Sequence, residues 1–122
     1  MLVISSVITA GLIYGLNSIL LKLFGVRVVT SFGPVGEELI KTFVAVVFAV
    51  DIVLSHVAFG VIEGLWDFNR NSKHGWQACI LSIVAHAVFG LITIAAYQKT
   101  TYVLVGVFAA TLAHWLWNVY FV

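Results

Sequence analysis

The fold is decided by residues 75–98, GWQACILSIVAHAVFGLITIAAYQ, a stretch without any Asp, Glu, Lys or Arg. A helix needs about 20 predominantly apolar residues to cross a hydrocarbon core about 30 Å thick. This stretch meets that length and predicts a membrane-spanning helix. One histidine, His86, stands midway along it, and a polar group at that depth needs a partner from another helix or water.

The rest of the chain has the same character. Of its 122 residues, 62% are hydrophobic and only 9% are charged, and the mean hydropathy is +1.12. Soluble domains are about 45–50% apolar and about 25% charged. We therefore predict an all-α polytopic membrane bundle of four to five helices, two of them short, in a single integral membrane domain over residues 1–122. The expected helices are about 1–24, 34–50, 52–69, 75–98 and 101–122.

The boundaries rest on a few punctuating residues. No positively charged segment precedes the first apolar stretch, so we expect residues 1–24 to be a retained helix rather than a signal peptide. Residues 25–33 are expected to be a link, because Pro34 suits the first position of a helix. Asp51 divides the next stretch into two helices, each short enough to be tilted or re-entrant. Ser72 is expected to cap the helix that follows it.

Basic residues predict the orientation. Lys22 and Arg27 fall on one side of the predicted bundle, Arg70 and Lys73 return to that side, and Lys99 alone falls on the other. Cytoplasmic loops collect Lys and Arg, which predicts the N-terminus outside and the C-terminus inside. The net charge of +1 indicates no surface for nucleic acid.

Small residues indicate close helix packing. Gly11 and Gly15, and likewise Gly60 and Gly64, have the four-residue spacing at which membrane helices approach each other closely. Both pairs are compatible with packing inside one chain and with a dimer contact. The one cysteine, Cys79, is expected to be a small apolar helix residue, since no base near it in the sequence would activate its thiol.

Five ionisable residues lie in or at the mouth of these apolar stretches: Glu37, Glu38, Glu63, His86 and His114. Acids and histidines are costly in a membrane unless they face water or one another, so they indicate a functional site by default. We predict that all five converge on one polar site.

The acids have different neighbours in sequence. Glu37 and Lys41 are spaced for an i,i+4 ion pair, and a plain salt bridge at a helix start would satisfy that pattern. A functional reading keeps one of Glu37 and Glu38 as a base while the other is held by Lys41 or by the backbone. Glu63 has no well-placed basic neighbour except Arg70, and we predict a functional role for it.

Three more polar residues belong to the same helices. Asp67 is expected to pair with Arg70 at the interface. His56 shares a helix face with Glu63 but is expected to be structural. Asn118 follows His114 by one turn and could orient its imidazole or add a donor to a pocket that stabilises charge.

In this order the motifs resemble the PrsW-type intramembrane proteases, within the wider group of CAAX prenyl endopeptidases and bacteriocin-immunity proteins (CPBP, or Abi). The pattern E-E-x-x-K corresponds to Glu37–Lys41, F-x-x-x-E to Phe59–Glu63, the mid-helix histidine to His86, and H-x-x-x-N to His114–Asn118. The CAAX enzymes would typically carry arginine at position 41 and histidine at position 63, so the PrsW branch fits better. The chain is much shorter than typical members.

The resemblance implies a peptidase without a cofactor, in the cell membrane of a prokaryote. Glu37 or Glu38 would activate water as a general base. His86 and His114 would hold the water or stabilise the oxyanion, Asn118 would orient or donate, and Glu63 would hold a histidine in the needed tautomer. The substrate would be a membrane protein or a lipidated peptide within the lipid bilayer, and a homo-oligomer is left open.

Two other functions use the same residues. Glu38, Glu63, His86 and His114 could bind zinc or another divalent metal in a metal-dependent hydrolase, although no H-E-x-x-H or E-x-x-H occurs. The cluster could also serve a small transporter or a non-enzymatic immunity or binding protein. A blind, water-filled pocket would favour hydrolysis, and a path open from both sides would favour transport.

Overall fold

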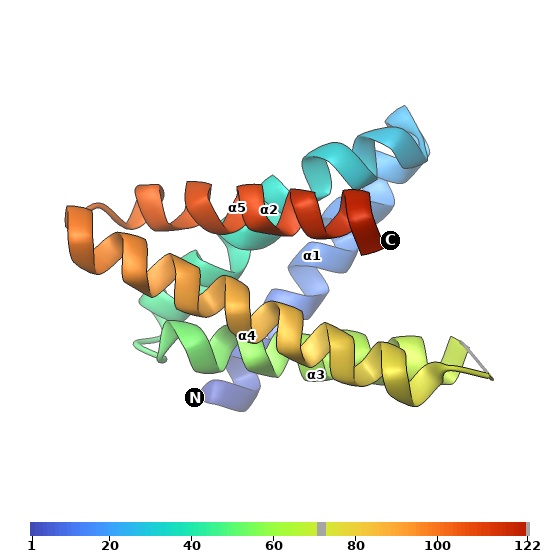
Figure 1. Ribbon diagram of the computed structural model, residues 1–122, viewed down its shortest axis with the longest axis horizontal. Helices are drawn as coiled ribbons and strands as arrows, with labels where there is room; N and C mark the ends of the chain where they lie inside the picture. The colour runs from blue at the N-terminus through green and yellow to red at the C-terminus, as the bar shows by residue number, and fades with distance from the viewer. Residues whose placement is uncertain (71–72, 122) are drawn as a thin grey trace.

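The computed structural model describes residues 1–70 and 73–121, which form a bundle of five helices (Figure 1). Consecutive helices run in alternating directions. They are α1 (Leu2–Phe24), α2 (Val26–Val47), α3 (Ile52–Arg70), α4 (Gly75–Thr100) and α5 (Val103–Phe121). The all-α fold is confirmed, and α1, α4 and α5 are each long and apolar enough to span a membrane.

The start of α2 differs from the prediction. Only Gly25 separates α1 from α2, with a φ of 82° that suits glycine. The link expected over residues 25–33 is therefore wrong, and Pro34 lies inside α2 rather than at its first position. Proline has no N–H, so the Thr30 carbonyl loses its usual helical partner there. The sequence predicts a helix start at Pro34, whereas the helix already begins after Gly25, nine residues earlier.

The predicted division at Asp51 is confirmed. Ala49 has a φ of 52° just beyond α2, and the Val50 N–H donates to the Ala45 carbonyl at 2.8 Å, which ends the helix in a Schellman-type turn. The Asp51 carboxylate then accepts the Leu54 N–H at 2.9 Å and caps α3. The expected cap by Ser72 at the start of α4 lies outside the described residues.

Glycines bring α3 and α4 into close contact. A Cβ on Gly60 would lie 3.0 Å from the Ile83 Cα, and one on Gly64 would lie 2.9 Å from the Cys79 carbonyl oxygen. Gly60 and Gly64 therefore pack inside the chain. No such neighbour among the described residues lies within 4 Å of a Cβ built on Gly11 or Gly15, so that pair faces outward from α1.

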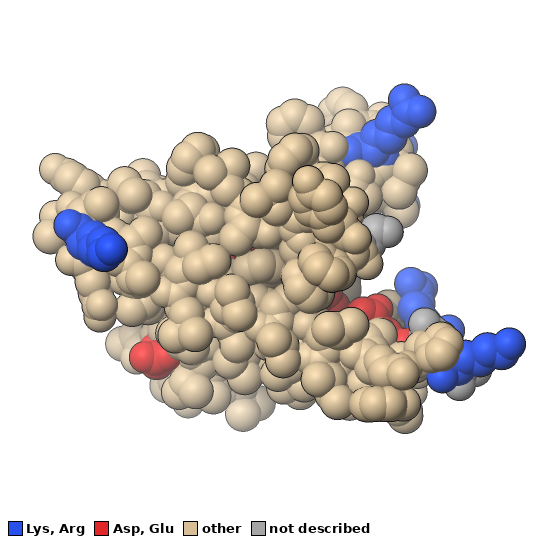
Figure 2. All heavy atoms as spheres, in the orientation of Figure 1, with Lys and Arg blue, Asp and Glu red and all other residues tan. Residues whose placement is uncertain are grey.

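The bundle is apolar outside and polar inside. Large apolar side chains such as Val3 and Leu104 are exposed, whereas Glu38, Lys41 and His56 are fully buried. In Figure 2 the surface is mostly uncharged, and basic side chains project above and below a hollow in which acidic atoms are visible. This distribution is what a helix bundle surrounded by lipid requires.

Candidate functional site

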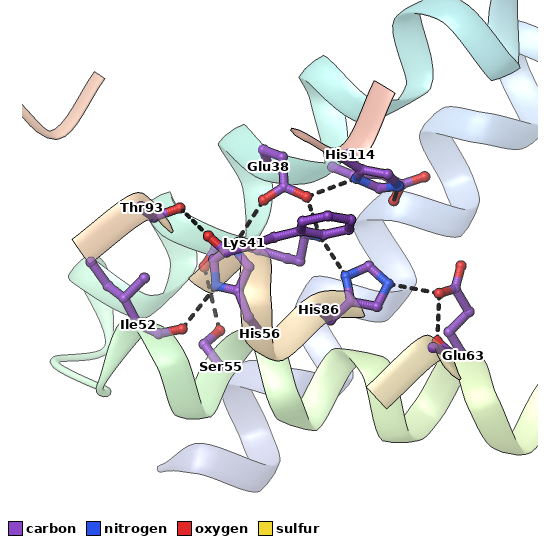
Figure 3. A network of polar contacts seen from close by, with 12 residues as sticks. Glu38, Lys41, Ile52, Ser55, His56, Glu63, His86, Thr93 and His114 are labelled. Atoms are coloured by element: carbon purple, nitrogen blue, oxygen red, sulfur yellow. Dashed lines mark hydrogen bonds and ion pairs between the residues drawn. The ribbon is translucent and has the colours of Figure 1, made fainter. Parts of the chain in front are cut away.

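Glu38 is the centre of a buried polar network contributed by four helices (Figure 3). Its Oε1 lies 2.5 Å from the Lys41 Nζ and 2.8 Å from the His114 Nδ1. Its Oε2 lies 2.9 Å from the His56 Nε2. A buried carboxylate is tolerated when its lone pairs are satisfied in this way, and Glu38 has three donors.

Lys41 links Glu38 to the next histidine. It is completely buried, and besides Glu38 its ammonium contacts the His86 Nδ1 at 3.0 Å. The predicted i,i+4 pair between Glu37 and Lys41 is wrong, because Lys41 pairs with Glu38 at i,i+3. Both spacings bring side chains together on a helix, and the sequence did not reveal that Glu37 turns toward α1 instead.

The partners of His86 define its protonation. Its Nδ1 faces the Lys41 ammonium, which can only donate, so Nδ1 must accept. Its Nε2–H then donates to the Glu63 Oε2 at 2.7 Å. Glu63 also accepts a hydrogen bond from the Ser82 hydroxyl at 2.8 Å. His86 is therefore a neutral imidazole held between a cation and an acid, with both nitrogens occupied.

His56 also belongs to this network, and its burial away from the cavity lining is compatible with the structural role expected for it. Its Nδ1 lies 2.8 Å from the Ile52 carbonyl oxygen, and its Nε2 faces Glu38. These two contacts tie the fully buried ring of His56 on α3 to the carboxylate at the centre of the network. The helix face that it shares with Glu63 was the sequence signal for this placement.

Glu37 and His114 form an outer pair beside a cavity. Because Nδ1 of His114 donates to Glu38, its Nε2 carries a lone pair when the ring is neutral. That Nε2 lies 3.8 Å from the Glu37 Oε2, which is too far for a direct hydrogen bond. Glu37 Oε2 is buried without a hydrogen-bond partner. The ring of His114 is held by stacking on Phe89 at 4.7 Å between centroids.

The cavity beside this pair has a volume of about 410 Å³. Glu37, Glu63, His86, His114 and Asn118 all line it, whereas Glu38 lies behind its wall. The structure thus brings together all six residues proposed from the sequence, in two layers. Asn118 forms no hydrogen bond with His114 in the described part of the chain, so the orienting role expected for it is not seen.

Asp67 lines the same cavity. Its expected ion pair with Arg70 is wrong, because the Arg70 guanidinium lies over the Trp66 ring at 5.0 Å from the centroid. Arginine stacks readily on an aromatic face. Asp67 therefore keeps its carboxylate without an ion pair among the described residues.

Asn17, on α1, was missed from the sequence. Its Nδ2 donates to the Glu37 Oε1 at 2.9 Å, which leaves Oε2 as the free oxygen of that carboxylate. The signal was weak, since a single asparagine in an apolar helix has no characteristic spacing to the acids. It is nevertheless a polar residue inside a predicted span, and such residues seek partners.

Among residues 1–70 and 73–121, no group of three His, Cys, Asp or Glu side chains is placed to hold a metal ion. The donor set itself explains this. The Lys41 ammonium stands between Glu38 and His86, where a divalent cation would need to contact both. The alternative ligands Glu38, Glu63 and His86 are instead held by hydrogen bonds to one another's helices and to Lys41, and His114 is held through its Nδ1 by Glu38.

Comparison of the chain with protein-family models, with curated proteins and with solved structures found no match.

Proposed function

We propose that this chain is a membrane-embedded hydrolase in which Glu37 activates a water molecule for attack on a peptide bond. The reaction is the one carried out by the PrsW-type proteases that its motifs resemble. The observation that carries the proposal is the outer pair. Glu37 lines the cavity, and its Oε2 has no hydrogen-bond partner among the described residues and lies 3.8 Å from the His114 Nε2. A water molecule at about 2.8 Å from each atom would bridge that gap.

The roles of the residues follow from their hydrogen bonds. Glu38 keeps the proton of His114 on Nδ1, so Nε2 can accept one hydrogen of the bridging water. Glu37 accepts the other hydrogen and takes that proton as the water oxygen bonds to the carbonyl carbon. The same proton then passes to the nitrogen of the leaving amine when the carbon–nitrogen bond breaks. Glu37 is thus the base, and Glu38 positions His114.

The developing oxyanion needs a donor at the cavity wall. Asn118 lines the cavity from α5, one turn beyond His114, and its side-chain amide is uncommitted among the described residues. An amide N–H directed at an oxyanion is worth about 10²–10³-fold in rate. His86 is less suited to that task, since both of its nitrogens already have partners. We assign it to holding Glu63 and Lys41 in place.

The shape of the cavity favours hydrolysis over transport. Its lining residues on α3, α4 and α5 come from the halves of these helices nearest the Arg70 end, except Phe89, which lies just past the middle of α4. Toward the opposite end the interior is filled by Lys41, His56 and Phe59, which are at most 1% exposed. A path through the bundle is therefore blocked by packed side chains, as expected for a blind reaction chamber.

The orientation expected from the basic residues suits this scheme. Arg70 is the last residue of α3, at the end of the bundle where the cavity lies. If that end is cytoplasmic, with the N-terminus outside and the C-terminus inside, the chamber draws its water from the cytoplasmic side.

The test is hydrolysis in water enriched in ¹⁸O. The protein would be reconstituted in liposomes with a mixture of single-span polypeptides, and new C-termini would be read by mass spectrometry. We expect the wild type to place ¹⁸O in new carboxylates and Glu37→Gln to lose about 10²–10⁴-fold in rate. Undiminished cleavage by Glu37→Gln would overturn the assignment of the base, and cleavage that requires a stoichiometric bound metal would favour the metal-dependent alternative.

A further inference from the structure

The cavity wall carries more negative charge than the proposed hydrolysis uses. Three carboxylates line it, from Glu37, Glu63 and Asp67, and no Lys or Arg is among the lining residues that the structure describes. Lys41 is engaged behind the wall by Glu38 and His86, and Arg70, whose charge reaches Asp67, is not a lining residue and stacks on Trp66. The lining therefore does not balance its own charge.

One of these carboxylates points to a ligand independently of the others. Glu37 is only 9% exposed, and no residue that the structure describes forms a hydrogen bond with its Oε2. A buried polar atom without a partner is costly, so this oxygen is expected to accept a hydrogen bond from a bound molecule. The free oxygen of Glu37 would be satisfied by a water molecule or another donor at the bottom of the cavity. A second acid, nearer the mouth of the cavity, is not explained by that contact.

Asp67 is that acid. It follows Glu63 by four residues on α3, so the two carboxylates stand one turn apart on one helix face. Glu63 is held by His86 and Ser82, whereas Asp67 forms no ion pair within the described residues. Figure 2 shows acidic atoms exposed in the hollow of the molecule.

The remaining walls suit an organic cation rather than a metal ion. Phe89, Trp117 and Phe121 line the cavity, and the last two rings stack at 4.4 Å between centroids. Aromatic faces attract ammonium and guanidinium groups. Ala78 and Leu81 on α4 complete an apolar wall along which an alkyl stem can lie.

We propose that the cavity binds a positively charged group on an apolar stem, an alkylammonium or guanidinium, with Asp67 as its principal counter-charge and Glu63 as the second. The group would be a lysine or arginine side chain close to the cleaved bond. That identification rests on the proposed hydrolysis, whereas binding of the cation itself does not.

Binding is tested with hexylammonium against hexanol and hexanoate, which have the same alkyl chain without the positive charge. Each would be titrated into the protein in lipid nanodiscs and followed by calorimetry, with empty nanodiscs as the blank. We expect hexylammonium to bind about tenfold more tightly than either analogue, and Asp67→Asn to remove most of that preference. Asp51→Asn is the matched control, because it makes the same change outside the cavity and keeps a capping side chain.

Equal binding of hexylammonium and hexanol, or an undiminished preference in both Asp67→Asn and Glu63→Gln, would overturn the proposal. The polypeptide arm compares cleavage of single-span substrates that carry lysine or norleucine near the cut site, and we expect the lysine form to be preferred. A cation preference that depends on Asp67, in a protein that hydrolyses nothing, would leave this inference standing and refute the proposed function.

Discussion

Glu37 and Glu38 are neighbours in sequence and opposites in environment. Glu38 is fully buried and meets three donors, from Lys41, His56 and His114. Glu37 has one donor, Asn17, and leaves its second oxygen unpartnered at a cavity. Successive residues on a helix point about 100° apart, so a pair of adjacent acids can supply one structural and one reactive carboxylate. The saturated network should therefore govern stability, and the outer pair should govern chemistry.

The largest expected effect is on the inner network. Lys41→Met removes the cation from Glu38 and His86 at a completely buried position. Breaking a buried ion pair from one side typically costs about 3–5 kcal/mol, which would be measured as the free energy of unfolding in mixed micelles. Glu37→Gln is the control from the outer pair, and we expect it to change stability by less than about 1 kcal/mol. Equal losses of unfolding free energy in the two variants would contradict the distinction between the network around Glu38 and the outer pair of Glu37 and His114.

The next effect concerns the link from α1 to the outer pair. Asn17→Leu removes the donor that holds the Glu37 Oε1, and a hydrogen bond to a charged group is worth about 1.5–3 kcal/mol. We expect a loss of about 10–100-fold in kcat and a displaced pH–rate profile, with KM little changed. Asn69→Leu is the matched control, since within the described residues the Asn69 side chain bonds only the Leu65 carbonyl of its own helix. A normal pH–rate profile in Asn17→Leu would contradict the positioning role.

The smallest effect tests the close packing of α3 against α4. Gly60→Ala would place a Cβ 3.0 Å from both the His86 Cβ and the Ile83 Cα, so α3 and α4 must separate slightly. Overpacking of this kind costs about 1–3 kcal/mol. Gly11→Ala, where no neighbour lies within 4 Å of the new Cβ, should be neutral or slightly stabilising. Thermal unfolding of both variants checks the comparison.

Much of the architecture could be predicted from the sequence because the membrane restricts the choices. Long apolar runs define helices, Asp51 marks a turn, and ionisable residues inside such runs must find one another. The convergence of Glu37, Glu38, Glu63, His86 and His114 follows from that cost alone.

The finer assignments depended on facts that spacing does not contain. Lys41 can reach an acid at i−3 or i−4, and only the packing of α2 against α1 and α5 selects Glu38. Asp67 loses Arg70 to the ring of Trp66, a competition between two short-range contacts of similar strength. The start of α2 differs from the prediction because glycine and proline both interrupt helices, and the position of Pro34 is equally compatible with a helix start and with a helix interior that loses one hydrogen bond.

The buried Lys41–Glu38 pair also has a consequence for how the protein is made. Unlike α1, α4 and α5, the helices α2 and α3 are not apolar enough to be candidate spans on their own. A lone charge at the centre of a bilayer costs about 2.5–3.5 kcal/mol during insertion, so a nascent α2 is a poor candidate for independent entry. We expect α2 to leave the translocon late, together with α3, to which the tight turn at Ala49 joins it. Its buried charges would gain their histidine partners only when α4 and α5 have been made. Synthesis of α5, which supplies His114 to Glu38, would then commit the five-helix bundle to the membrane.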